Sequence, residues 1–270
     1  MLQDQGLDAK LLSGGQSLIP MLAFRLTSCT SLIDLKHVPE LDKISIGAQG
    51  IKIGSRVRWR DIERDARLSV AHPLLSQTIP HIAHYAIRNR GTVGGSLAHA
   101  DPAAEFPALA VTCDASIEIG SAVGRRIVPA SRFFLAPLTT VLEPEEMIIS
   151  IHFPSWPCTR KSGFQEFCRR KGDFAIAGAI VYFDQGDDGK ITSARVGAFG
   201  VAGTPILLSK AADFLLGKEL TTDICEQAAD LGVRDLDVCG DLQSNADYRR
   251  ALLRTMIKRA LLDTCRLAVQ

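Results

Sequence analysis

The chain has 270 residues, of which 46% are hydrophobic and 23% charged, and its formal net charge is +1. This length accommodates one large or two medium domains, and the charge balance gives no reason to expect nucleic acid or an acidic membrane as partner. No apolar run reaches the roughly 18 residues of a membrane span, and the N-terminus lacks a charged-then-apolar signal sequence. We therefore expect a cytoplasmic protein without a membrane span.

The first half of the chain alternates short strands with helices. Period-two patterns and turn signals predict strands at residues 10–13, 31–35, 43–46, 51–54, 116–120, 126–129 and 146–153. Three-and-four spacing predicts helices at residues 18–26, 58–68, 72–87 and 103–112. Pro80 is expected to split the third helix, and Asp101-Pro102 to cap the last.

A proline-rich break at residues 154–157 precedes a change in composition, so we expect two domains, residues 1–156 and 157–270. The second half begins with three predicted strands, at residues 163–168, 175–183 and 191–199. Helices are predicted at residues 207–216, 223–233 and 247–267. The expected layout is a small antiparallel sheet with helices packed on it.

Two similar Gly-Gly segments are the candidate binding elements. In the first, residues 11–18, Gly14 and Gly15 carry no Cβ and can let several backbone N–H groups converge on an anion. The second, residues 92–97, repeats the order hydroxyl, Gly-Gly, hydroxyl, Leu. Each alone is typical of a plain turn between apolar segments, but the pair predicts a two-sided clamp on one phosphate-bearing ligand.

Metal chemistry and acid–base catalysis find little support in the residue pattern. The seven cysteines include no C-x-x-C pair, which argues against an iron–sulfur cluster or a zinc ribbon. His72, His81 and His84 share one segment, but no carboxylates stand at matching positions. Nor is there a convincing acid–base pair or Ser–His–Asp spacing, so we predict no metal site and no catalytic residue.

Three motifs carry a resemblance to a known family: residues 9–20, residues 87–105, and residues 169–175 with the sequence Arg-Arg-Lys-Gly-Asp-Phe-Ala. With them the chain resembles the flavin-binding medium subunit of molybdenum hydroxylases, the xanthine dehydrogenase and carbon monoxide dehydrogenase family. The resemblance implies an α+β protein with a two-subdomain FAD-binding domain of the vanillyl-alcohol oxidase/PCMH type. A small domain of three-stranded antiparallel sheet plus helices would follow it.

The resemblance also implies FAD-contacting residues by motif position. These are Leu12, Ser13, Gly14, Gly15, Gln16, Ser17, Leu18, Thr92, Gly94, Gly95, Ser96, Glu105 and Ile148. Glu105 stands where the family commonly has Asp, and its carboxylate would accept a ribose hydroxyl or a backbone donor. Ile148 stands where relatives place an apolar residue against the cofactor, although a core isoleucine fits equally well.

The chain departs from the family pattern at two places. Gln165-Glu166 stands where relatives often carry a lysine near the flavin, so no cationic partner for the flavin N1 region is carried over. Fewer residues precede Leu11 than in relatives. Either the true start lies upstream, or the first subdomain lacks an edge strand.

The implied function is that of an electron-transfer flavoprotein subunit. A large molybdopterin-binding subunit would oxidise the substrate, a small 2Fe-2S subunit would pass electrons on, and FAD would deliver them to NAD, a quinone or oxygen. The assembly would be a dimer of heterotrimers. Two alternatives stay open: a free-standing FAD oxidase of the same fold, and a flavin-free assembly subunit in which both Gly-Gly segments are plain turns.

Overall fold

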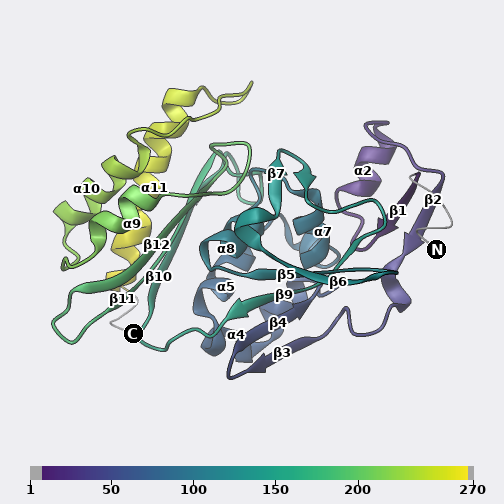
Figure 1. The fold of residues 1–270 in the computed structure, drawn as a ribbon. Coiled ribbons are helices and arrows are strands. Elements are labelled where there is room, and N and C mark those ends of the chain that lie inside the picture. The colour runs from purple at the N-terminus through teal and green to yellow at the C-terminus, as the bar shows by residue number, and fades with distance from the viewer. Residues whose placement is uncertain (1–7, 267–270) are drawn as a thin grey trace.

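The computed structural model describes residues 8–266, beginning with a small N-terminal unit, residues 9–34. Strands β1 (Ala9–Leu12) and β2 (Ser31–Asp34) pair in parallel, and helix α2 (Leu18–Ala23) lies in the connection between them. Two consecutive parallel strands need such a crossover, because a tight hairpin turn would make the second strand antiparallel to the first. No residue of α2 is buried, and the unit forms one end of the molecule (Figure 1).

A five-stranded antiparallel sheet, the central sheet, follows in the order β3-β4-β9-β5-β6. The strands are β3 (Ile44–Gly47), β4 (Gly50–Gly54), β9 (Met147–Pro154), β5 (Ser116–Ser121) and β6 (Gly124–Pro129). Ile51, Ile53 and Ile151 are buried, as period-two alternation on a half-buried sheet requires. A small hairpin, β7 (Phe134–Ala136) and β8 (Thr139–Thr140), was not expected from the sequence.

Short helices pack with the central sheet and bring the chain to the second Gly-Gly segment. They are α3 (Trp59–Arg64), α4 (Ala66–Ala71), α5 (Pro73–Thr78), α6 (Tyr85–Arg88), α7 (Val93–His99) and α8 (Glu105–Thr112), with 3₁₀ turns at Leu35–His37, Ile79–His81 and Ala130–Arg132. The single helix predicted for residues 58–68 is wrong. Asp65 ends α3 and caps α4, because its side chain accepts a hydrogen bond from the Arg67 N–H.

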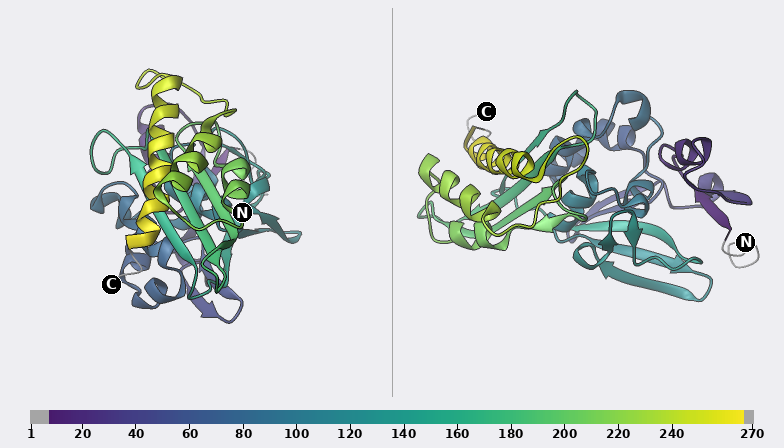
Figure 2. Two further views of the ribbon diagram at one scale, coloured as in Figure 1. Left: turned by 90° about the vertical axis from the view of Figure 1, so that its left-hand side faces the viewer. Right: turned by 90° about the horizontal axis from the view of Figure 1, so that it is seen from above.

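The C-terminal sheet is antiparallel and sequential: β10 (Lys161–Phe167), β11 (Ala177–Gln185), β12 (Ile191–Phe199) and β13 (Ile206–Leu207). It has four strands rather than the predicted three, because the two-residue β13 is too short to leave a periodic pattern. Helices α9 (Ser209–Leu215), α10 (Thr222–Val233) and α11 (Ala246–Arg266) cover one face (Figures 1 and 2). In the described part of the chain, no helix combines the length and apolar character needed to cross a bilayer.

Helix α8 lies between the two sheets, and all eight of its residues are buried. Phe106 contacts Trp59 and Phe153 on the side of the central sheet, with ring centroids 4.9 and 5.9 Å apart. On the other side, Thr112 packs so tightly on Gly197 of β12 that a Cβ there would overlap its hydroxyl. The helix therefore makes one apolar core out of residues from both sheets.

The start of α8 differs from the prediction that Asp101-Pro102 caps it. Asp101 Oδ1 instead accepts a hydrogen bond of 2.8 Å from the Ala103 N–H, which makes a local turn, and the helix begins at Glu105.

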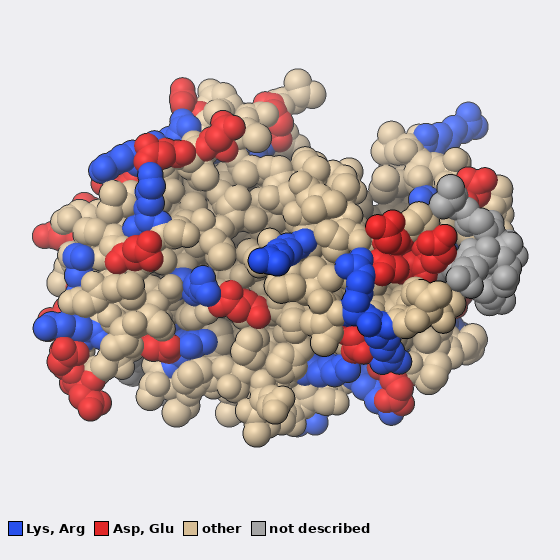
Figure 3. Space-filling view, in the orientation of Figure 1, with Lys and Arg blue, Asp and Glu red and all other residues tan. Residues whose placement is uncertain are grey.

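Charged side chains of both signs are interspersed over the face shown in Figure 3, in keeping with the net charge of +1.

Candidate functional site

The first Gly-Gly segment joins β1 to α2. Gly15 has a φ of +72°, a left-handed conformation that glycine adopts at little cost. Gly14 packs against the backbone of the 90–91 segment so closely that a Cβ would overlap the Arg90 carbonyl oxygen. The two glycines thus have different roles: Gly15 permits the turn, and Gly14 permits the close approach of a second segment.

A row of free backbone donors follows from this turn. Within residues 8–266, no acceptor takes the N–H groups of Gly14, Gly15, Gln16, Ser17 and Leu18. Consecutive N–H groups that turn around a concave surface bind anions, because each contributes a partial positive charge without a side chain in the way. The Gln16 side chain donates to the Gly14 carbonyl oxygen over 3.1 Å, so it tightens the same turn.

The second Gly-Gly segment is the first turn of helix α7, and the prediction of a matching turn is wrong. Thr92 caps the helix by accepting a hydrogen bond from Gly95, and neither Gly94 nor Gly95 has a positive φ. The N–H groups of Val93 and Gly94 donate to the carbonyl oxygens of Val57 and Ser55. These donors are therefore occupied, unlike those of the first segment.

The two segments nevertheless lie against each other. Ser13 Oγ and Thr92 Oγ1 are 2.9 Å apart and share a hydrogen bond. Ser13, Gly15, Thr92, Gly95 and Ser96 all border the same cavity. Sequence positions about eighty residues apart therefore meet at one wall.

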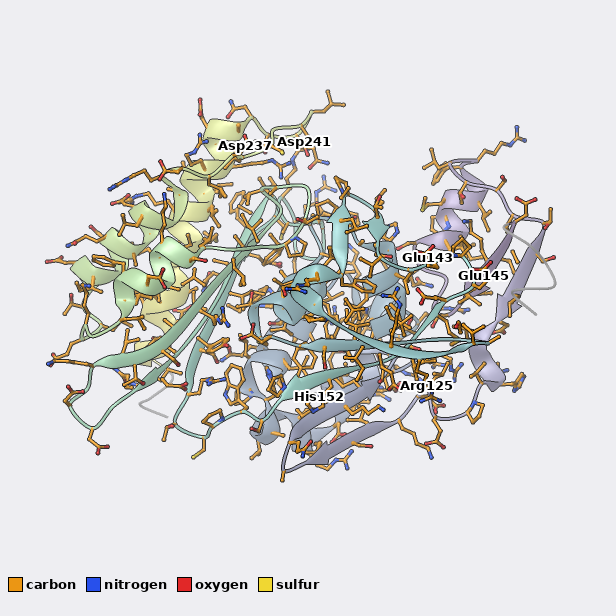
Figure 4. The ribbon with its side chains drawn as sticks, viewed as in Figure 1. Arg125, Glu143, Glu145, His152, Asp237 and Asp241 are labelled. Carbon is orange, nitrogen blue, oxygen red and sulfur yellow. The ribbon has the colours of Figure 1, made fainter. Side chains whose placement is uncertain are left out.

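The cavity has a volume of about 910 Å³, near the upper end of the roughly 300–1,000 Å³ of small-molecule and cofactor sites. Residues 9–18 and α7 supply one part of its wall. The loop before β9 borders it through Pro144 and Glu146, and Glu143 and Glu145 stand on that same loop (Figure 4). A row of free N–H groups beside a cavity of this size fits a large ligand with phosphate groups.

Of the thirteen residues carried over as FAD contacts, eleven line this cavity. They are Leu12, Ser13, Gly14, Gly15, Gln16, Ser17, Leu18, Thr92, Gly95, Ser96 and Glu105. Gly94 instead packs on Ser55, where a Cβ would lie 2.5 Å from the Ser55 Cβ. Ile148 is buried in the core beside Ile119 of β5.

Glu105, at the start of α8, is 6% exposed and lines the cavity. Burial, and after it the negative charges of Glu166 and Asp101, raise the pKa of its carboxyl to about 8. At neutral pH the group therefore carries a proton. It can donate a hydrogen bond into the cavity, whereas the sequence suggested an ionised acceptor.

The far wall of the cavity comes from segments that the sequence did not mark as neighbours. Ile82, Ala83 and His84 line it together with Arg169 and residues 172–174. Gln243 closes the same end, and its carbonyl oxygen accepts from Arg169 Nη2 over 3.2 Å. Gln243 belongs to the loop between α10 and α11, which also carries Asp237 and Asp241 (Figure 4). Only residues 169–174 carried a signal, as part of the third motif.

Two further residues, Arg88 and Gln165, have structural partners. Arg88 donates to the carbonyl oxygens of Ile82 and Ala83 and pairs with Glu63 at 2.9 Å, so it braces the turn beside the cavity. Gln165, which stands at the family's lysine position, donates to Asp263 of α11 over 2.5 Å. Its side chain is thus engaged away from the cavity wall.

Comparison with known proteins identifies the class. Residues 1–156 match the family model of the FAD binding domain in molybdopterin dehydrogenase, and residues 162–264 match that of the CO dehydrogenase flavoprotein C-terminal domain. The chain belongs to the family of FAD-binding medium subunits of molybdenum hydroxylases, which are flavoprotein oxidoreductase subunits. Its cofactor is FAD, and the free N–H row beside the cavity fits the diphosphate of that group.

Particular relatives span nearly the whole chain. The 6-hydroxypseudooxynicotine dehydrogenase complex subunit alpha of Paenarthrobacter nicotinovorans is 37% identical over 261 residues, 97% of this chain and 88% of that protein. The carbon monoxide dehydrogenase medium chain of Hydrogenophaga pseudoflava is 34% identical and covers 97% of this chain and 91% of its own. The structure of quinoline 2-oxidoreductase from Pseudomonas putida 86 superposes with a TM-score of 0.94 at 35% identity, over 100% of this chain and 93% of that one.

Proposed function

We propose that this chain is the electron-transfer subunit of a molybdopterin and iron–sulfur hydroxylase or dehydrogenase. In this arrangement residues 1–156 form the FAD-binding domain, and residues 157–270 form the C-terminal domain, which adds the 169–174 loop to the cavity wall. FAD supplies the chemistry by accepting electrons and passing them to NAD, a quinone or oxygen. The chain's own residues bind and orient it.

The observation that carries the proposal is the free N–H row at Gly14 to Leu18 beside a cavity of about 910 Å³. Those donors would hold the diphosphate, while the hydroxyl groups of Ser13 and Thr92 keep the two Gly-Gly segments together. The far wall, at Ile82 to His84 and residues 172–174, would receive the flavin ring. Ile82, Ala83 and Phe174 would give that ring apolar side chains to pack on.

The proposed function also implies two partner subunits. We propose a large molybdopterin-binding subunit and a small 2Fe-2S subunit, assembled as a dimer of heterotrimers. The described residues contain no group of three His, Cys, Asp or Glu side chains arranged to hold a metal ion. In this arrangement electrons would reach this chain from the clusters of the small subunit.

The test combines cofactor content with co-purification. The chain, isolated after expression from its own operon, is expected to carry or take up one FAD, read from the flavin absorption bands, and to bring a molybdenum subunit and an iron–sulfur subunit with it. A chain that neither retains nor rebinds FAD would refute the flavin proposal. A chain that purifies alone and oxidises an organic substrate without molybdenum or iron would identify it as a free-standing oxidase instead.

A further inference from the structure

A buried arginine anchors the α10–α11 loop, which reaches the far wall of the cavity. Arg249, in the first turn of α11, is 7% exposed. Its Nη1 atom donates to the carbonyl oxygens of Ile176, directly before β11, and Gly200, directly after β12. Its Nη2 atom pairs with the carboxylate of Asp241 on the loop (Figure 4). This guanidinium therefore joins the loop to the ends of two strands of the C-terminal sheet.

Asp241 in turn folds the part of the loop that carries Gln243. Its Oδ1 atom accepts hydrogen bonds from the N–H groups of Gln243 and Ser244, over 2.8 and 3.0 Å. The Asp241 N–H donates to the Ser244 carbonyl oxygen over 2.9 Å and closes the same turn. A side-chain oxygen that accepts from two consecutive N–H groups fixes the backbone around them. Asp241, itself held by Arg249, thus sets the direction of the Gln243 carbonyl group.

The Gln243 carbonyl oxygen holds the side chain of Arg169. It accepts from Arg169 Nη2 over 3.2 Å, and both residues border the cavity. Within residues 8–266 the Arg169 side chain makes no other hydrogen bond and no ion pair with a carboxylate. A guanidinium whose charge is not neutralised inside the protein is free to interact with an anionic ligand.

The charge of Arg169 matters because few cations face the cavity. Among the described residues, the Lys and Arg side chains that line it are Lys10, on the wall of residues 9–18, and Arg169, on the far wall. The carboxyl-bearing residues that line it are more numerous: Asp101, Glu105, Glu146 and Asp173. An anionic ligand is repelled by each ionised carboxylate and attracted by each cation, so the position of Arg169 bears directly on affinity.

We propose that Arg249 and Asp241 are positioning residues of the FAD site: through Gln243 they hold the Arg169 guanidinium at the far wall, where its positive charge strengthens the binding of FAD. This inference rests on the proposed function, because FAD is there the anionic ligand of the cavity. Without the Gln243 carbonyl, the long Arg169 side chain would spread over many rotamers in solvent. Its charge would then be screened, and binding of FAD would have to order it again.

The charge of Arg169 is tested by titrating FAD into the full chain, freed of cofactor, and following the quenching of flavin fluorescence. Arg169→Met removes the charge from an exposed side chain, so we expect the Kd to rise by about two- to fivefold. The rise is expected to shrink as added salt increases from about 0.05 M to about 0.5 M. Arg132→Met is the matched control, because it changes the net charge equally at an exposed residue that does not border the cavity. An Arg169→Met Kd equal to that of the wild type, or a rise that salt does not alter, would overturn the inference.

The positioning role is tested by a double-mutant cycle. Asp241→Ala removes the acceptor that folds the loop and leaves Arg249 its two carbonyl partners. We expect it to raise the Kd by a factor no larger than that of Arg169→Met, and to cause no further rise when both substitutions are combined. Urea unfolding of each variant measures the loss of stability separately, since a purely structural role would lower stability without this coupling to Arg169.

Arg249→Lys provides a second route to the same result. Lysine keeps the positive charge but lacks the planar fork that reaches the two carbonyl groups and Asp241 together, so the same coupling to Arg169 is expected. It replaces Asp241→Ala if that chain does not fold. No rise in Kd from either loop variant, or equal rises with and without Arg169, would overturn the inference while leaving FAD binding intact. Failure of the wild type to bind FAD at any salt concentration would instead contradict the proposed function.

Discussion

Replacing Gly15 with valine is expected to be unfavourable because of the backbone conformation rather than because of steric overlap. The new Cβ would lie 3.2 Å from Ile19 Cγ1 and 3.3 Å from Leu12 Cδ1, and both are flexible side-chain ends that can move aside. The φ of +72° is the greater obstacle, because an L-residue in the left-handed region costs about 1–2 kcal/mol and a β-branched one is a clear outlier there. If the turn of the valine variant adopts another conformation without FAD, binding of FAD must return residue 15 to the left-handed region. The cost of about 1–2 kcal/mol is then lost from the free energy of binding, which weakens FAD binding by about 5- to 30-fold.

The cost of the strained turn can reduce either FAD affinity or the stability of the cofactor-free chain, so both are measured. Flavin fluorescence titration gives the Kd, and urea unfolding of the cofactor-free chain gives the free energy of unfolding. The two losses together are expected to reach about 1–2 kcal/mol. Gly15→Asn is the control, since asparagine tolerates the left-handed region. A valine variant equal to the wild type in both measurements, or an asparagine variant as impaired as valine, would refute the assignment of Gly15 as the turn-forming residue.

Two further predictions concern residues around the site. Gly94→Ala places a Cβ 2.5 Å from the Ser55 Cβ and 2.8 Å from its carbonyl oxygen, so we expect a loss of about 1–3 kcal/mol of unfolding free energy in urea. Gly47→Ala, with open space at its Cβ, is expected to have little effect, and equal stability of both variants would contradict this packing role. A hydrogen bond from Lys52, with two other partners, lowers the pKa of Glu118 to about 2, so its stabilisation is present above its ordinary pKa of 4.5 and lost as the pH falls through about 2. Glu118→Gln should therefore destabilise the protein near neutral pH and much less near pH 2, and a destabilisation that does not vary with pH would exclude this origin.

The first Gly-Gly segment could be predicted from the sequence because its cause is local. A strand, two glycines and a helix start are adjacent in the chain, and the positive φ of Gly15 is a property of that turn. The long helices α10 and α11 were predictable for a similar reason, since several turns of three-and-four spacing identify them.

The second Gly-Gly segment shows where such reasoning stops. Thr92 to Ser96 repeats the residue pattern of the first segment, yet it forms a helix, because Thr92 caps it and the carbonyl oxygen of Ser55, directly after β4, accepts from the Gly94 N–H. The start of helix α8 was also not predictable from the local sequence pattern. A helix buried on every side has no polar face, so its pattern does not mark where it begins.

The far wall of the cavity depends on contacts between segments separated by most of the chain. Gln243 reaches it from the α10–α11 loop, and residues 172–174 reach it from the segment between β10 and β11. No local pattern records such neighbours. The motif around residues 169–174 indicated that this loop matters, but its position had to come from the structure.

The burial of α8 determines which wall of the cavity can open. Separating the two sheets would expose a helix with eight buried residues, and each large apolar side chain costs about 1.5–3 kcal/mol to expose. Among residues 8–266 the N-terminal unit has no comparable anchor, since α2 buries none of its residues and β1 and β2 pair only with each other. Local opening therefore costs least at the wall formed by residues 9–18, and we expect FAD to exchange past β1 and α2.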